Sequence, residues 1–311
     1  MRGDFVPALA FAVVATLPIT IPSMAYPSVG AGEAPGVYGL FLGMEYSEMR
    51  GDVDALMLYD AVAAGLSNFR EGIALVASIP GGIRLNAIQS AIATLASEMV
   101  AGDVFMVYVS SHGGSFPSGS ETTANPGDEF VVLGNLLTDD DLTSLLGGMD
   151  DIEKWVLLDT CNAGGFWGDN NPNDAGDLEK LANIGLLAAA YEDGEYANAW
   201  SDEAGRGYFN LGLIDALSIG ANGHLVGDIN GNGIPTFEEL TSWLMGYADE
   251  RTSQWAMEWG DGYLWLPQSF SSPDFIGSLG YQPVAIPTPA ALVLAGIGAS
   301  SARWLRRRRT I

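Results

Sequence analysis

Cysteine and histidine are scarce in this chain of 311 residues, which has one cysteine, Cys161, and two histidines, His112 and His224. A single cysteine excludes any disulfide within the chain. A lone cysteine is most often a buried, inert thiol, but in an exported protein it is open to oxidation unless it is buried or used in chemistry. The surroundings of Cys161 therefore decide whether it is a functional residue.

Basic residues are also few. The chain has 13 Lys and Arg against 38 Asp and Glu, a formal net charge of −25, and five of the basic residues fall within the last nine positions. A surface this acidic repels nucleic acid and anionic lipid and attracts cations and basic peptides. We expect no nucleic-acid partner.

The N-terminus lacks the uninterrupted run of about 20 apolar residues that a membrane helix needs. Arg2 precedes an apolar run from Phe5 to Ile21 that Pro7 and Pro18 interrupt. Ser23, Met24 and Ala25 then form a small-residue cleavage site. Residues 1–25 are therefore predicted to be a secretory signal peptide, with an uncleaved membrane anchor as the alternative.

Apolar runs alternate with segments of helical periodicity from Val37 to about Leu217. The near-continuous apolar runs typical of strands buried on both faces are Val37–Leu42, Ile73–Ala77, Val104–Val109, Trp155–Leu158 and Ile184–Ala190. The segments with helical spacing are Ala55–Leu66, Ile88–Met99, Leu142–Leu146 and Tyr208–Leu217. This alternation predicts an α/β fold with a mostly parallel sheet and helices on both faces.

Reactive residues follow two of these strands. Strand Val104–Val109 is followed by His112 and two glycines, and strand Trp155–Leu158 by Asp159, Thr160 and Cys161. Because parallel strands present reactive groups at their carboxyl edge, neighbouring strands would bring a base and a nucleophile together. A thiolate needs an adjacent imidazole to form and to protonate the leaving amine. The backbone N–H groups of Gly113 and Cys161 are the expected oxyanion donors.

At these residues the sequence resembles the caspase-like clan of cysteine peptidases and is most similar to metacaspases and their bacterial relatives. The His-Gly pair, the Asp-x-Cys pair and the His112–Cys161 separation of 49, against about 50 in caspases, carry the resemblance. It covers roughly Val37 to Leu240. Metacaspases usually have His-Ser where this chain has Asn162 and Ala163, and Gly113-Gly114 is also similar to the legumain branch, so the subfamily stays open.

The resemblance implies an endopeptidase with His112 as base and Cys161 as nucleophile. It places Asp159 in the primary specificity pocket, where a carboxylate would pair with a substrate Arg or Lys, and Asp193 as a second pocket residue. Protein or basic peptide substrates are the expected partners. The alternatives are a capping role for Asp159 and, for the whole protein, a catalytically silent module that binds partners at the cell surface in a calcium-dependent manner.

A second motif is independent of the first. The segment 228–239 has the spacing of an EF-hand calcium loop, with oxygen ligands expected from Asp228, Asn230, Asn232, Ile234, Thr236 and Glu239 and a sharp turn at Gly233. The glycines before it make an entering helix doubtful, so a single EF-like or dockerin-like loop is expected. A turn without metal is the alternative. Metacaspases also have a separate activating calcium site, for which the resemblance offers Asp128, Asp139, Asp140 and Asp169 by position, with solvated surface acids as the alternative.

The C-terminus combines a Pro-Thr-Pro segment, a short apolar run from Ala290 to Ala302 and a basic cluster. It resembles the PEP-CTERM sorting signal of bacterial surface proteins, with a plain tail anchor as the alternative. The expected organisation is a peptidase domain at 34–250, a tail and linker at 251–285 and a sorting signal or membrane anchor at 286–311. The protein is thus predicted to be exported to the cell envelope, where membrane sorting machinery would be a partner.

Overall fold

A computed structural model of the chain describes residues 35–78, 81–116, 129–168, 177–192, 199–259 and 265–279. These residues form a six-stranded sheet in the order β2-β1-β3-β7-β8-β9. The strands are β1 Val37–Glu45, β2 Phe69–Ser78, β3 Val104–Ser110, β7 Glu153–Asp159, β8 Ile184–Ala188 and β9 Gln268–Ser271. All neighbouring pairs are parallel except β8 and β9.

Burial explains why the central strands are apolar throughout. Every residue of β3, β7 and β8 is buried, because each of these strands is covered on both faces and has a neighbour on either side. Burying such side chains contributes about 25 cal/mol for each Å² of apolar surface removed from water. The predicted α/β class with a mostly parallel sheet is confirmed, and all five predicted strands are present.

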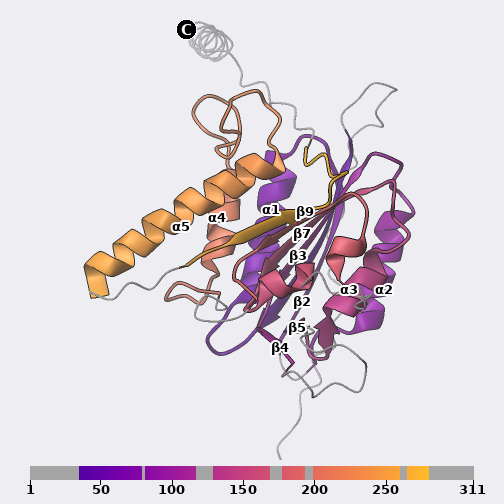
Figure 1. The fold of residues 1–311 in the computed structure, drawn as a ribbon, viewed down its shortest axis with the longest axis horizontal. Helices are drawn as coiled ribbons and strands as arrows, with labels where there is room; N and C mark the ends of the chain where they lie inside the picture. The colour runs from indigo at the N-terminus through magenta and orange to yellow at the C-terminus, as the bar shows by residue number, and fades with distance from the viewer. Residues whose placement is uncertain are drawn as a thin grey trace, which may run out of the picture.

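Helices cover both faces of the sheet, as Figure 1 shows. One face packs against α1 Gly51–Gly65, α4 Tyr208–Ala216 and α5 Phe237–Trp259. The other packs against α2 Leu85–Ala96 and α3 Asp139–Leu146. Two separate apolar clusters, one on each side of the sheet, form the core.

The chain after residue 250 differs from the expected tail and linker. Helix α5 continues to Trp259, and β9 then adds an antiparallel edge strand beside β8. Trp265 is 1% exposed and its indole N–H donates to the Ala189 carbonyl at 2.9 Å. Leu279 is fully buried. Residues 265–279 therefore belong to the domain, because they close the edge of the sheet and complete one of its cores.

A smaller, three-stranded antiparallel sheet was not expected from the sequence. It consists of β4 Gly113–Ser115, β5 Glu129–Val132 and β6 Leu136–Thr138, in that order. Since β4 begins three residues after β3 ends, this small sheet is attached to the carboxyl edge of the large one. It builds one wall beside His112.

The predicted terminal segments, 1–25 and 286–311, lie outside the described residues. A search of the described helices finds none with the length and apolar character needed to cross a membrane.

Candidate functional site

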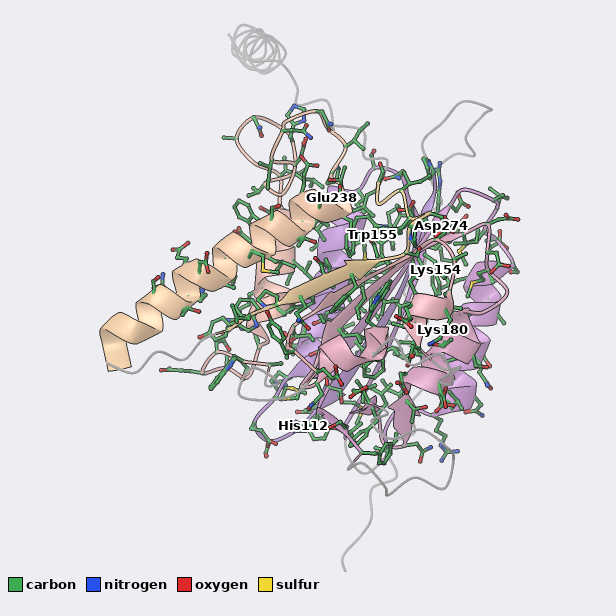
Figure 2. The ribbon with its side chains drawn as sticks, in the orientation of Figure 1. His112, Lys154, Trp155, Lys180, Glu238 and Asp274 are labelled. Carbon is green, nitrogen blue, oxygen red and sulfur yellow. The ribbon has the colours of Figure 1, made fainter. Side chains whose placement is uncertain are left out.

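Strands β3 and β7 bring the two reactive residues to one place. Their register pairs Ser110 with Asp159, and His112 and Cys161 each follow this pair by two residues. A methyl group on Gly113 would overlap the Thr160 hydroxyl and the Cys161 carbonyl oxygen, so the backbone beside His112 touches the backbone at the thiol. Figure 2 shows His112 at this end of the ribbon. The fold thus places His112 and Cys161 at the same edge of the sheet.

The Cys161 thiol is partly buried. Burial raises the pKa of Cys161 above its ordinary value, the Ala199 backbone N–H acts in the opposite direction, and the charge of Asp159 raises it further. The sulfur is therefore protonated at neutral pH and needs a base before it can attack. This requirement gives the neighbouring imidazole a chemical role.

The His112 ring is held by two residues that precede α1. Its Nε2 lies 3.0 Å from Oε1 of Glu48, and its face packs on the Tyr46 ring at a centroid distance of 4.3 Å. In the described part of the chain, the hydrogen bond of the ring thus goes to Glu48 rather than to Cys161. Catalytic hydrogen bonds often tighten only when substrate binds. Neither Tyr46 nor Glu48 was found from the sequence, because both lie in an irregular loop without periodicity.

The residue after the nucleophile makes a tight turn. Asn162 has a φ of 56°, in the left-handed region, and leads into a 3-10 helix at Ala163–Trp167. Asparagine tolerates this conformation better than most residues because its short side chain can form local hydrogen bonds. Its Nδ2 donates to the Glu192 carbonyl. Asparagine is therefore compatible with the backbone conformation at this position.

Two carboxylates are buried side by side behind the thiol. Asp159, at the end of β7, is 3% exposed, and Asp54, in the first turn of α1, is fully buried. Each accepts a hydroxyl hydrogen bond, Asp54 from Ser110 at 3.2 Å and Asp159 from Tyr108 at 3.3 Å. No lysine or arginine of the described ranges forms an ion pair with either one. Asp54 was missed in the sequence because it resembles an ordinary acidic residue at the start of a helix.

The N-terminus of α4 offsets part of this negative charge. The backbone N–H of Gly207 donates to Asp54 at 2.9 Å, and that of Asn210 donates to Asp159 at 3.3 Å. The helix dipole adds to these bonds because its positive end faces both carboxylates. A side chain at Gly207 would overlap the Asp159 carboxylate, so glycine leaves the room that this arrangement needs.

Burial nevertheless favours the neutral carboxylic acids. It raises the pKa of Asp54 to about 7, and the hydrogen bonds from Gly207 and Ser110 only partly oppose it. Burial, followed by the charge of Asp54, raises the pKa of Asp159 well above its ordinary value. Two buried acids of this kind, without a cation, would gain from a positively charged ligand between them.

The other acids expected near the site are only partly described. Asp139 and Asp140 begin α3, where Thr138 and Asp141 form a capping box. Three acids lie outside the described residues. One is Asp193, expected in the specificity pocket, and the other two are Asp128 and Asp169, expected with Asp139 and Asp140 at a calcium site. The described ranges contain no group of three or more His, Cys, Asp and Glu side chains arranged to hold a metal.

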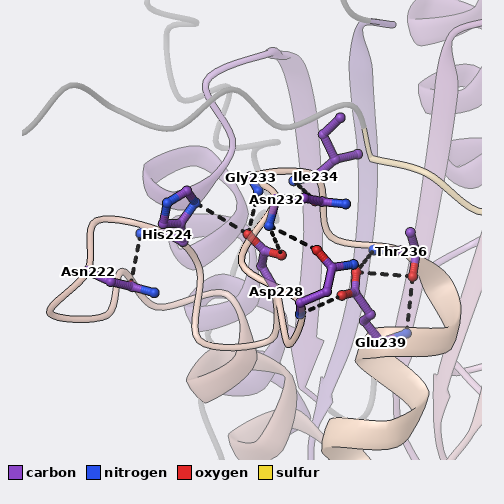
Figure 3. Close-up of polar contacts among 9 residues, drawn as sticks. Asn222, His224, Asp228, Asn232, Gly233, Ile234, Thr236 and Glu239 are labelled. Carbon is purple, nitrogen blue, oxygen red and sulfur yellow. Dashed lines mark hydrogen bonds and ion pairs between the residues drawn. The ribbon is translucent and has the colours of Figure 1, made fainter.

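The segment 228–239 folds as one compact loop, drawn in Figure 3. Both carboxylate oxygens of the buried Asp228 accept backbone N–H bonds, from Asn232 at 3.1 Å and Gly233 at 2.6 Å. Glu239 reaches back to the N–H of Asn230 at 3.0 Å, and the side chains of Asn230 and Asn232 also bond within the loop. No helix enters the loop, since α4 ends at Ala216 and turns follow it.

This donor set fits calcium. The loop supplies carboxylate, amide, hydroxyl and carbonyl oxygens at the expected spacing, and calcium prefers such hard oxygen ligands. Thr236 and Glu239 also form a capping box at the start of α5, with bonds of 3.0 and 3.2 Å. Thr236, at the end of the loop, pairs with Ser278, whose N–H donates to Glu153 at the beginning of β7. Because Cys161 follows the other end of β7, the loop lies at the opposite edge of the sheet from Cys161. Figure 2 shows Glu238 and His112 at opposite ends.

Comparisons with known proteins find similarity to a caspase domain in the middle of the chain. A model of the caspase domain matches residues 82–230, a stretch that includes His112, Asp159 and Cys161. Among curated proteins, none matches the chain. A crystal structure of a Geobacter sulfurreducens protein is similar with a TM-score of 0.50 and 18% identity, covering 78% of this chain and 97% of that one. Caspase-1 from Spodoptera frugiperda gives a TM-score of 0.48 and 12% identity, covering 82% and 92%.

The raised pKa of Asp54 makes stability depend on pH. Its folded pKa of about 7 exceeds the ordinary 3.8, so its contribution is fully present below about pH 4 and is lost as pH rises to about 7. We expect the stability of wild type relative to Asp54→Asn to fall by about 1.4 kcal/mol per pH unit in that window. Urea denaturation at several pH values measures this. Asp60→Asn, on the exposed side of α1, is the control and should follow wild type; parallel wild-type and Asp54→Asn profiles would refute the prediction.

Proposed function

We propose that the protein is a cysteine endopeptidase in which Cys161 is the nucleophile and His112 the general base. The observation that carries this proposal is the register of β3 and β7, which places both residues two positions beyond one strand pair. The caspase-domain match over residues 82–230 supports the same class of chemistry. Because burial raises the pKa of the Cys161 thiol, the reaction needs a base to take its proton, and His112 at the same edge of the sheet is the proposed base.

The reaction follows from the residues present. His112 takes the proton from the Cys161 sulfur, and the thiolate attacks the carbonyl carbon of the scissile peptide bond. The backbone N–H groups of Gly113 and Cys161 are the proposed donors to the resulting oxyanion. The imidazolium then gives its proton to the leaving amine, the C–N bond breaks, and a thioester remains on Cys161. Water, deprotonated by His112, hydrolyses the thioester and restores the thiol.

The buried acids support a preference for basic residues. Asp159 precedes the nucleophile by two positions, and Asp54 is buried in the same surroundings, so the single positive charge of a substrate Arg or Lys would favour the ionised form of one of the two acids. A cationic ligand also offsets the cost of ionising these acids in the interior. Substrates are therefore proposed to be proteins or peptides with a basic residue before the scissile bond.

A silent, calcium-dependent surface-binding module is the second candidate. The absence of a His112–Cys161 hydrogen bond in the described structure is the observation that favours it. The two candidates differ in the reactivity of the thiol. If His112 and Cys161 act together, alkylation of Cys161 by iodoacetamide at neutral pH should be fast and should slow when His112 is replaced. In a silent module, alkylation should be slow and independent of His112.

Export to the cell envelope is part of the same proposal. It depends on residues 1–25 and 286–311, a predicted signal peptide and a predicted PEP-CTERM-like sorting signal or tail anchor that membrane sorting machinery would recognise.

Removing either member of the dyad should abolish peptide hydrolysis. Cys161→Ala and His112→Ala are each expected to lower kcat/KM by several orders of magnitude, and the double variant by no more, because the two groups act as a unit. His224→Ala is the matched control. It removes the only other histidine of the chain, and His224 lies beside the loop at 228–239, away from Cys161. Steady-state hydrolysis of basic peptides measures the effect. Activity near wild type in either dyad variant would exclude the proposed mechanism.

Asp159→Asn should weaken the preference for basic substrates. The measurement is the ratio of kcat/KM for a peptide with arginine to kcat/KM for the same peptide with citrulline, its neutral isostere. This ratio cancels effects of the substitution on the dyad. A hydrogen bond to a charged group is worth about 1.5–3 kcal/mol, so the ratio should fall roughly 10- to 100-fold. Asp60→Asn should leave the ratio unchanged. Wild-type cleavage after acidic residues would show that the pocket assignment is wrong.

We further propose that calcium binds the loop through Asp228, Asn230, Asn232, Ile234, Thr236 and Glu239. When bound, the ion would hold the segment between α4 and α5 together. Because the loop lies at the opposite edge of the sheet from Cys161, its effect should be mainly on stability. The hydrogen-bonded loop around the buried Asp228 supports this proposal.

Glu239→Gln tests the calcium site. Glutamine can keep the bond of the capping box but loses one carboxylate oxygen, which is both a calcium ligand and an acceptor within the loop. Most of the calcium-induced rise in Tm, measured for each variant against its own Tm in chelator, should therefore disappear. Saturation at a hundredfold excess over Kd should stabilise wild type by about 2.7 kcal/mol. Glu238→Gln, which changes the exposed neighbouring acid, is the control and should keep the calcium response. No calcium response in wild type would contradict the site.

A further inference from the structure

The loop between β1 and α1 contacts the face and the edge of the His112 ring. Tyr46 packs against the ring face at 4.3 Å, with the planes tilted by 59°. Glu48 lies at the ring edge, with its Oε1 3.0 Å from Nε2. Both contacts come from a segment that lies outside the residues matched by the caspase-domain model.

This segment is anchored on both sides of Glu48. The Tyr46 hydroxyl donates to the Val132 carbonyl at 2.6 Å, and the Tyr46 N–H donates to Met49 at 2.8 Å. The N–H of Arg50 donates to the Gly205 carbonyl, also at 2.8 Å. The backbone that carries Glu48 is therefore fixed relative to the small sheet and to the loop before α4. The contact with His112 follows from a defined loop rather than from a freely moving side chain.

The chemistry of the two partners sets the state of the ring. Neutral imidazole carries one N–H, and an ionised carboxylate can only accept. The hydrogen bond from Ser47, and then that from His112, hold the pKa of Glu48 below its ordinary value, so it is ionised at neutral pH. The Glu48 carboxylate therefore selects the tautomer with hydrogen on Nε2 and leaves the lone pair of Nδ1 free to accept a proton.

We propose that Glu48 is a positioning residue that fixes the tautomer and orientation of His112 and stabilises the imidazolium formed when the thiol is deprotonated. This inference rests on the proposed peptidase function and adds a third member to its Cys–His pair. An exposed ion pair alone contributes little to folding stability, so a merely structural role would leave no kinetic trace. The two roles therefore give different experimental results.

Two variants separate the parts of the role. Glu48→Ala removes both the acceptor and the charge, whereas Glu48→Gln retains an acceptor and removes only the charge. We expect Glu48→Ala to lower kcat roughly 10- to 100-fold. This loss is smaller than the loss of about 10⁴-fold known for a buried triad carboxylate. The kcat of Glu48→Gln should lie between those of Glu48→Ala and wild type. KM should not change, because Glu48 contacts the His112 ring and not the substrate. Tm should not change, because the Glu48 side chain is exposed. Glu45→Ala, which changes an acid at the end of β1 near Arg50, is the control.

Two further measurements do not require peptide cleavage. Nitrogen NMR of the two histidines should show the Nε2–H tautomer of His112 in wild type and a mixture in Glu48→Ala. Alkylation of Cys161, the single thiol of the chain, should slow in Glu48→Ala and not in Glu45→Ala. If wild type cleaves no peptide, the proposed function fails, yet the alkylation rates still decide the role of Glu48. An alkylation rate within twofold of wild type in Glu48→Ala overturns this inference.

Discussion

The parallel pairing of β3 with β7 is the constraint on which the site depends. A shift of one residue in this register would turn the side chains of one strand to the other face and separate the positions of His112 and Cys161. The register is secured by complete burial of both strands, since each face packs into a different apolar core. Precision at an exposed edge thus comes from apolar packing in the interior, and the reactive residues themselves contribute little to it.

The buried carboxylates represent the opposite case, in which a site reduces stability. Asp54 and Asp159 are held without a lysine or arginine partner in the described structure, and only hydroxyl and N–H groups offset their charge. An apolar pair of similar volume would stabilise the fold more. A basic substrate, as proposed above, would supply the missing cation, and its binding would offset part of the free-energy cost of ionising these acids in the interior.

The sequence predicted those features that depend on local patterns. The central strands were predicted because burial on both faces makes them apolar throughout, and the position of His112 and Cys161 at one edge was predicted because each follows such a strand. Strand β9 was missed because it is short and polar, with the sequence Gln-Ser-Phe-Ser. Tyr46, Glu48 and Asp54 were missed for another reason. Their roles depend on which segments meet in space, and no spacing along the chain records that α1 and its preceding loop lie beside β3.

Helix α4 connects the two ends of the molecule. Its N-terminal N–H groups face the carboxylates near Cys161, while the turns after its C-terminus lead directly into the loop at 228–239. Gly227, just before that loop, donates its N–H to Ala216, the last residue of the helix, at 2.8 Å. A metal that orders the loop would therefore restrain the C-terminal end of α4, a helix packed on α1 and α5. Because the loop lies at the opposite edge of the sheet from Cys161, this restraint would add to the stability of the domain rather than act on the thiol.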